Sequence, residues 1–261
     1  MSKVLLTTTA TVVGFLLASA VAAPASAQKP LGNPPADYWT GWYIGANAGG
    51  SWGDTKLRTT VTPGAGAGTV SGADAAAISA ASHDTSNKAG FTGGAQAGYN
   101  YLYNNAWLFG VEGDWEGMDI RSSSSKSVAS TVVPSTVYTI NQDVKAGWLA
   151  TLRPRVGYAY NNYLFYGTIG FAWADLKYDA SLANNKGLPT IAGSSSTTKT
   201  GWAGGLGVAY AWSPHWHFRG EWLYADLGHA NAATINGTAA SIKPDDNVAA
   251  NLVRAGFDYR F

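Results

Sequence analysis

Eight segments of the chain alternate between apolar and polar residues with a period of two. This period places every second side chain on one face of a strand, so it predicts β-strands and not helices. Aromatic residues recur on one face, as Trp42 does in the first segment and Phe257 in the last. Each segment is long enough to cross a bilayer as a tilted strand, which takes about 9–11 residues. The predicted strands are residues 42–53, 90–101, 107–118, 145–160, 163–174, 201–212, 216–227 and 250–261.

The connections between these strands are of two kinds. Three are short turns, at Asn104-Asn105, Asn161-Asn162 and Ser213-Pro214; Asn tolerates left-handed backbone and Pro presets φ. Four are long, and within the first of them residues 64–81 form a low-complexity stretch that we expect to be an exposed, mobile loop. Short turns at one end and long loops at the other are typical of bacterial outer-membrane barrels, with the short turns in the periplasm. The long loops are predicted at 54–89, 119–144, 175–200 and 228–249.

The polar face of the predicted strands carries five acids and five arginines, while the predicted loops carry lysines instead. Arginine suits buried, multidentate pairing with carboxylates, and a charge left unpaired inside a closed barrel is costly. Eight strands leave an interior only wide enough for side chains to fill. We therefore predict a plugged barrel with an internal salt-bridge network. Its expected members are Glu112, Asp114, Glu116, Arg153, Arg155, Arg219, Glu221, Arg254, Asp258 and Arg260.

Composition agrees with this interpretation. Charged residues make up 13% of the chain, about half the usual share of a soluble domain. The 11 Trp and 14 Tyr fit an amphipathic interface, because their rings have an apolar body and a polar tip. The chain has no cysteine, which excludes disulfides and thiolate metal sites.

The first 27 residues have the pattern of a secretory signal peptide: a basic start at Lys3, apolar runs and the small-residue site Ala25-Ser26-Ala27. Residues 28–40 contain three prolines and are expected to form a periplasmic tether before a barrel domain at 41–261. Without residues 1–27 the chain holds 16 basic and 16 acidic residues. It therefore lacks the basic excess that nucleic-acid binding normally needs.

Three segments resemble a known family. The sequences GWYIGANAGG at 41–50, LRPRVGY at 152–158 and RGEWLYADLG at 219–228 resemble motifs of the small OmpA-like outer-membrane barrels, which include porin-family and outer-membrane immunogenic surface proteins. Pro154 stands where that family prefers Gly, Trp222 where it has Tyr, and Ala209 where Glu is common. An identical internal network is therefore not assumed.

The resemblance implies an all-β, eight-stranded antiparallel up-and-down barrel spanning the outer membrane. It also implies a structural role in envelope integrity and surface interaction, and contact with outer-membrane lipid and lipopolysaccharide. The family is inserted by the barrel-assembly machinery, which recognises a C-terminal strand ending in an aromatic residue. Phe257, Tyr259 and Phe261 match that assembly signal.

Three other functions are weighed against this one. A narrow porin-like diffusion channel follows from the family name, but a filled interior disfavours it. Haemin capture would use His83 and His229, because histidine commonly ligates metals and haem iron; otherwise no cofactor or metal site is expected. A lipid-modifying enzyme needs a nucleophile with an adjacent base, and the sequence shows no such pair around His215 and His217, so no catalytic residue is predicted. The partner of the external loops is not identifiable from the sequence.

Deleting Phe261 should lower the amount of folded barrel in the outer membrane and activate the envelope stress response, because the assembly signal is truncated. The measurement is the fraction of protein whose gel mobility changes on boiling, in isolated outer membranes. Unchanged assembly of the truncated chain would contradict the assignment of the assembly signal.

Overall fold

The computed structural model describes residues 38–64, 69–187, 190–231 and 234–261, without the side chains of 54–57, 85–88, 229–231 and 244–247. The predicted signal peptide, residues 1–27, and the tether up to residue 37 lie outside the described residues. The described residues belong to one compact unit, Gly32–Phe261. None of the helices in the described part of the chain is long and apolar enough to cross a membrane.

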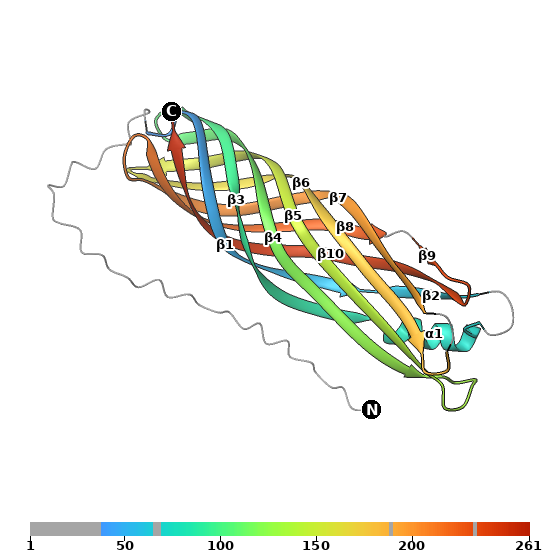
Figure 1. Ribbon diagram of the computed structural model, residues 1–261. Helices are drawn as coiled ribbons and strands as arrows, with labels where there is room; N and C mark the ends of the chain where they lie inside the picture. Colours follow the sequence, from blue (N-terminus) through green and yellow to red (C-terminus); the bar gives the residue numbers. More distant parts are fainter. Residues whose placement is uncertain (1–37, 65–68, 188–189, 232–233) are drawn as a thin grey trace, which may run out of the picture. The chain divides into compact units, whose positions relative to one another are not determined.

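Eight long strands form a closed antiparallel ring (Figure 1). Each strand pairs with the next along the chain, and the last returns to the first, with Ile44 opposite Tyr259. This is the all-β, eight-stranded up-and-down barrel that the alternation predicts. The ring strands are β1 (Gly41–Leu57), β3 (Asp84–Tyr103), β4 (Trp107–Ala129), β5 (Val137–Tyr160), β6 (Tyr163–Asn184), β7 (Ile191–Ala211), β8 (Trp216–Asn231) and β10 (Ala240–Arg260).

One end of the barrel, here called the short-turn end, carries the three predicted tight turns. Asn104, Asn105 and Asn161 have φ values of 49°, 53° and 52°, the left-handed region that asparagine tolerates. The beginning of β1 and the end of β10 lie at this end (Figure 1), where the Arg260 N–H donates to the His215 carbonyl at 2.8 Å.

The prediction of long loops is wrong for most of their length. It concerned residues 54–89, 119–144, 175–200 and 228–249. The strands continue through them, and the connection between β6 and β7 shrinks to residues 185–190. The alternation persists there with its polarity reversed. In β6, Phe171 faces outward near the middle, but farther along Lys177 faces outward and Leu176 is buried inside. Apolar residues therefore face out where lipid is expected and inward where water is expected.

The connection from β1 to β3 is folded into the open end opposite the turns, here called the extended end. It contains β2 (Thr59–Pro63), which pairs with β10, and α1 (Gly72–Ala81); a short strand, β9 (Ile235–Asn236), also pairs with β10. The expectation of an exposed, mobile loop over 64–81 is thus corrected for Gly72–Ala81, while residues 65–68 of that stretch lie outside the described residues. The alanine-rich sequence favours a helix, the Ser71 side chain caps it by accepting from the Asp74 N–H at 3.1 Å, and Ile78 is completely buried.

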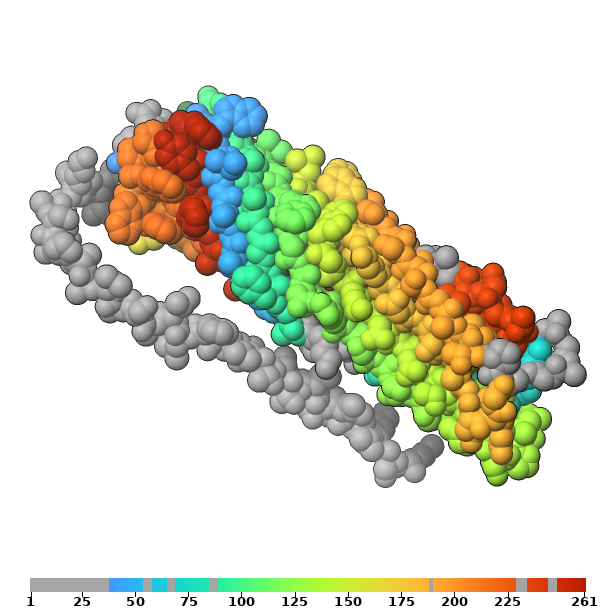
Figure 2. Space-filling model, viewed as in Figure 1, coloured from blue at the N-terminus to red at the C-terminus, as the bar shows by residue number. Residues whose placement is uncertain are grey.

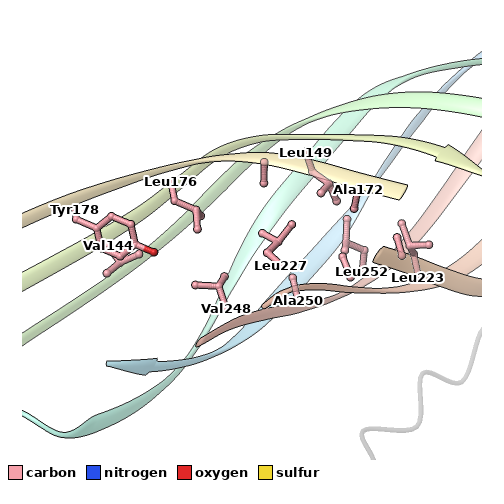
Figure 3. Packing of buried hydrophobic residues seen from close by; sticks show 13 residues of the cluster. Val144, Leu149, Ala172, Leu176, Tyr178, Leu223, Leu227, Val248, Ala250 and Leu252 are labelled. Atoms are coloured by element: carbon pink, nitrogen blue, oxygen red, sulfur yellow. The ribbon is translucent and has the colours of Figure 1, made fainter. Parts of the chain in front are cut away.

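The barrel interior holds three apolar clusters stacked along its axis. The turn-end cluster contains Trp39, Leu102, Leu108, Ala159, Leu164, Tyr166, Ala209 and Ala211. The middle apolar layer contains Val144, Leu149, Ala172, Ala174, Leu176, Tyr178, Ala203, Leu223, Ala225, Leu227, Val248, Ala250 and Leu252, whose side chains point into a common space (Figure 3). The cap cluster joins α1 and β2 to the strand ends through Val61, Val70, Ala75, Ile78, Tyr138, Ile140, Ala180, Leu182, Ile191, Ala239, Ala240 and Ile242.

A single carboxylate ties α1 to the loop between β4 and β5. Asp74 is buried and accepts hydrogen bonds from the Thr131 N–H and the Ser130 hydroxyl, both at 2.8 Å, and from the Thr131 hydroxyl at 3.1 Å. Burial acts to raise the pKa of Asp74, but these bonds outweigh it and hold the pKa below the ordinary value of 3.8. The ionised carboxylate is therefore the form that anchors the helix.

Replacing Asp74 by Ala should loosen α1 without unfolding the ring, because only the anchor of the helix is lost. Losing bonds to a buried carboxylate costs about 1–3 kcal/mol, so amide exchange within α1 should accelerate roughly 5- to 150-fold by hydrogen-exchange mass spectrometry. Asp119→Ala, which removes an exposed acid near the middle of β4, is the control and should leave α1 unchanged.

The same anchor gives α1 a defined pH dependence. The folded pKa of Asp74 is depressed, so its stabilisation is present above the ordinary carboxyl pKa and is lost as the pH falls through the folded value. After correction for intrinsic rates, exchange in α1 should rise at strongly acidic pH in the wild type but not in Asp74→Ala. Equal pH profiles in the two proteins would contradict the anchor.

Candidate functional site

Arg153 is the centre of a charge network between the turn-end cluster and the middle apolar layer. Its side chain is fully buried in β5, and each of its five N–H groups has an acceptor. The Nε donates to the Thr151 hydroxyl at 2.8 Å. The remaining four bonds run from Nη1 to Thr168 (2.9 Å) and Glu221 (2.8 Å), and from Nη2 to Glu112 (3.0 Å) and Asp114.

Among the described acids, Glu112 accepts hydrogen bonds from the largest number of arginines, which is three. It lies on β4 directly opposite Arg153 in the sheet register and is completely buried. The Tyr43 hydroxyl donates to its Oε2 at 2.7 Å, and Arg219 donates to the same oxygen. Arg155 reaches that oxygen at 3.5 Å. Burial of this carboxylate is thus offset by three guanidinium groups and one phenol.

A second centre lies on β10. Arg254 is directly opposite Glu221 of β8 in the register and bonds its Oε2 at 2.9 Å. It also donates to Asp114 at 3.1 Å and to Glu116. Because Glu221 and Asp114 bond both Arg153 and Arg254, the acids of β4 and β8 connect the two centres across the barrel.

Arg155 packs against an aromatic ring at the short-turn side of the network. Its guanidinium carbon lies 3.6 Å from the centroid of the Tyr166 ring, a cation–π contact in a desolvated site. Gly207 leaves the space for that ring, since an added Cβ would come within 2.3 Å of it. The glycine thus makes room for the tyrosine on which the arginine stacks.

The structure places Arg260 outside this network, contrary to the prediction. It lies at the last position of β10, half-exposed, where it donates to the carbonyls of Pro214 (2.8 Å) and Thr40. Asp258 is buried, but its nearest cation is Arg219 at 4.0 Å, and its closest bond is from the Gln96 amide at 2.7 Å. Within the described residues, four arginines therefore face five carboxylates, not the expected five and five.

Sequence reasoning missed the residue that covers the network at the short-turn end. Trp39 is 2% exposed and stacks on His217, with ring centroids 4.8 Å apart. It belongs to the same cluster as Tyr166, the ring beneath Arg155. The available signal was a pair of aromatic residues, Tyr38 and Trp39, directly before the first strand.

The remaining predicted site residues are dispersed. His83 is exposed at the extended end, and the side chain of His229 lies outside the described residues, so a haemin site on these two stays a prediction. Among the described side chains, no cluster of three or more His, Asp or Glu residues is arranged to hold a metal.

The predicted assembly residues lie on the outside of the last strand. Phe257 and Phe261 face outward, 49% and 70% exposed, and the Phe261 N–H donates to the Trp42 carbonyl at 3.0 Å. The assembly residues thus lie where β10 closes on β1.

The outer face of the ring is apolar over a continuous band. Large hydrophobic side chains stand exposed on all eight ring strands, including Trp42, Phe91, Trp115, Phe171 and Trp202, at 66%, 67%, 56%, 63% and 46%. A water-soluble protein rarely exposes so large a contiguous apolar surface, and aromatic residues at both borders are typical of membrane barrels. The charges lie inside and the apolar residues outside, the inverse of a soluble fold.

The chain matches the family model for the outer membrane protein beta-barrel domain over residues 13–261. The chain belongs to this family. It is an outer-membrane protein, so the short-turn end faces the periplasm and the extended end the exterior.

Two relatives are similar to nearly the whole of this chain. A 31 kDa outer-membrane immunogenic protein of Brucella melitensis is 30% identical and covers 97% of this chain and 98% of its own. A 25 kDa outer-membrane immunogenic protein of Brucella abortus is 26% identical over 94% and 92%. Among solved structures, OprG of Pseudomonas aeruginosa covers 86% of this chain and 97% of its own, at 16% identity and a TM-score of 0.45. Ail of Yersinia pestis covers 85% and 99%, at 16% identity and a TM-score of 0.39.

Replacing Arg153 by Met should lower the free energy of unfolding by about 3–5 kcal/mol, because three buried carboxylates lose their shared partner. The measurement is urea unfolding in lipid vesicles, followed by tryptophan fluorescence. Lys186→Met, in an exposed turn of the extended end, is the control and should unfold like the wild type. A variant with Met at position 153 that stays within about 0.5 kcal/mol of the wild type would show that the network is not needed for stability.

Proposed function

We propose that this outer-membrane barrel is closed to solutes and acts as a structural element of the envelope that presents a rigid surface to the exterior. The observation that carries the proposal is the filled interior. The charge network bridges the lumen from β4 and β5 to β8 and β10, with side chains 0–5% exposed in its ion pairs. Ions passing this level would have to displace groups that already satisfy one another.

The middle apolar layer supplies a second barrier of a different kind. A cavity of about 20 Å³ lies at this layer, and its lining is almost wholly apolar, with Leu149, Leu176, Leu227 and Val248 of the layer and the adjoining Ile120. A single water molecule needs roughly 10–15 Å³ of such space and two or more polar partners. The layer therefore offers no continuous chain of waters along which ions could move.

The external part of the barrel supports the surface-interaction role. The strands leave the lipid zone as a hydrogen-bonded sheet whose polar side chains face outward, and α1 and β2 close its open end. Residues presented on such a sheet hold fixed relative positions, as a recognition surface requires. The names of the Brucella relatives describe them as immunogenic at the outer membrane, which agrees with display at the cell exterior.

Single-channel recording in a planar bilayer separates this proposal from a narrow diffusion pore. The refolded wild type should show no steady conductance on the nanosiemens scale, and deleting residues 71–82 should leave it closed, because the charge network lies below α1. Steady openings in the wild type would overturn the proposal in favour of a pore. Openings only in the deletion variant would assign closure to α1 alone.

A further inference from the structure

The loop between β4 and β5 presents three valines to the exterior. Val132, Val133 and Val137 are 56%, 49% and 36% exposed, and they lie in residues 130–137, here called the valine tip. Among the described residues, every other large hydrophobic side chain that stands exposed belongs to the apolar band or to the aromatic residues of the short-turn end. Beyond the band, large apolar side chains otherwise turn inward, as Leu176 does. The valine tip is therefore an exception to the rule that governs the rest of the barrel.

Hydrogen bonds to two other segments hold the valine tip in one conformation. The Ser130 hydroxyl donates to the buried Asp74 of α1 at 2.8 Å, and its oxygen accepts from two backbone N–H groups of the loop. On the other side, the Asn185 side chain accepts from the Val137 N–H and donates to the Ser135 carbonyl, both at 3.0 Å. A surface fixed in advance loses little conformational freedom when a partner binds it.

The valine tip lies far from the bilayer that holds its own barrel. Residue 130 follows Trp115, in the apolar band of β4, by 15 residues, which is about 50 Å at the rise of a strand. With a strand tilt of about 35–45°, this length places the tip roughly 35–40 Å above that level. In the space-filling view the tip forms an end of the molecule, beside the turn between β6 and β7 (Figure 2). The valines therefore meet something outside their own membrane.

The chemistry of the valine tip limits what that partner is. Residues 127–142 contain no charged side chain, and the backbone N–H groups of 132, 133 and 137 already have acceptors. The tip therefore offers methyl groups, which neither pair with ions nor bond to sugar hydroxyls. A surface without charge can face an identical surface without repulsion, and a twofold axis brings equal residues together. Apolar side chains are self-complementary in that arrangement.

The valine tip is too small for a stable dimer within one membrane. Burying a valine removes about 100 Å² of apolar surface from water, so three valines supply roughly 300 Å² per copy, against roughly 800 Å² per partner in a specific interface. The tip also stands at the outer end of the barrel, so two barrels side by side cannot bring their tips face to face. Barrels in two opposing membranes can, and many weak contacts between two surfaces reinforce one another.

We propose that the valine tip is a homophilic contact, through which copies of this chain in two opposing membranes hold the membranes together. Val132, Val133 and Val137 of one copy pack against the same residues of the other across a twofold axis. The inference rests on the surface-interaction part of the proposed function and gives it a partner, a second copy of this chain. It does not depend on whether the barrel is closed to solutes.

The test measures aggregation of lipid vesicles that carry the full-length barrel, formed from detergent so that barrels insert in both orientations. Wild-type vesicles should aggregate, by turbidity, and should leave labelled protein-free vesicles dispersed. Val132→Ser/Val133→Ser should slow aggregation at least about tenfold, because multivalency multiplies the loss at each contact. The matched control, Thr198→Ser/Thr200→Ser, removes methyl groups from exposed residues on the side of β7 and should aggregate like the wild type. Every variant is first checked for the mobility change on boiling that reports a folded barrel.

A charge exchange at Val133 identifies the second copy as the partner. Vesicles with Val133→Lys and vesicles with Val133→Glu should each stay dispersed, because equal charges then meet across the axis. A mixture of the two should aggregate, and less so at high salt, since salt screens exposed charges. Wild-type aggregation should persist at high salt, because apolar contacts are not screened in this way.

Three results would overturn the proposal. They are equal aggregation of Val132→Ser/Val133→Ser and the wild type, dispersion of the mixed charge variants, and capture of protein-free vesicles by wild-type vesicles, which would assign the tip to lipid. A barrel that is closed in the conductance recording but does not aggregate vesicles would leave the proposed function standing and remove this contact alone.

Discussion

The interior of a closed eight-stranded ring cannot hydrate the charges it contains, and the rest of this structure depends on that constraint. A guanidinium or carboxylate in such a space is tolerable only if other side chains replace water around it. Arg153 meets this requirement completely, with an acceptor for each of its five donors. Those acceptors come from β4, β5, β6 and β8, so satisfying one arginine fixes the relative positions of four strands.

Side chains alternate between the inside and the outside along the whole length of each strand, but the outside is lipid for one part of the strand and water for the other. This difference explains which parts of the fold could be predicted. Near the middle of β6, Phe171 and Trp173 face lipid; farther along the same face, Lys177 and Asp179 meet water while Leu176 is buried. A search for strands with aromatic residues facing out identifies the lipid zone and the number of strands. It overlooks the extensions, because there the apolar residues face inward and the period alone does not say which face meets which solvent.

The site shows a similar division. Alternation assigns Arg153, Arg254 and Glu221 to the interior correctly, because the face of a strand residue depends only on its parity. It assigns Arg260 to the same network wrongly, because parity gives no height along the barrel axis. Arg260 stands at the rim, where the carbonyls of Pro214 and Thr40 accept its hydrogen bonds. Trp39 was beyond such reasoning altogether, since it fills the mouth of the barrel from outside any strand.

The interior combines charged and apolar layers, and the two contribute differently to a unique structure. The apolar residues of the middle layer would pack acceptably after small shifts between strands, because dispersion and burial depend weakly on direction. The charged pairs would not. A one-residue slip of β4 against β5 would turn Glu112, Asp114 and Glu116 toward lipid. Arg153 would then lose two of its three carboxylate partners, Glu112 and Asp114. Burial of apolar side chains therefore supplies adhesion along the barrel, while Glu112–Arg153 and Glu221–Arg254, each directly opposed across a strand pair, select the one register in which the chain can close.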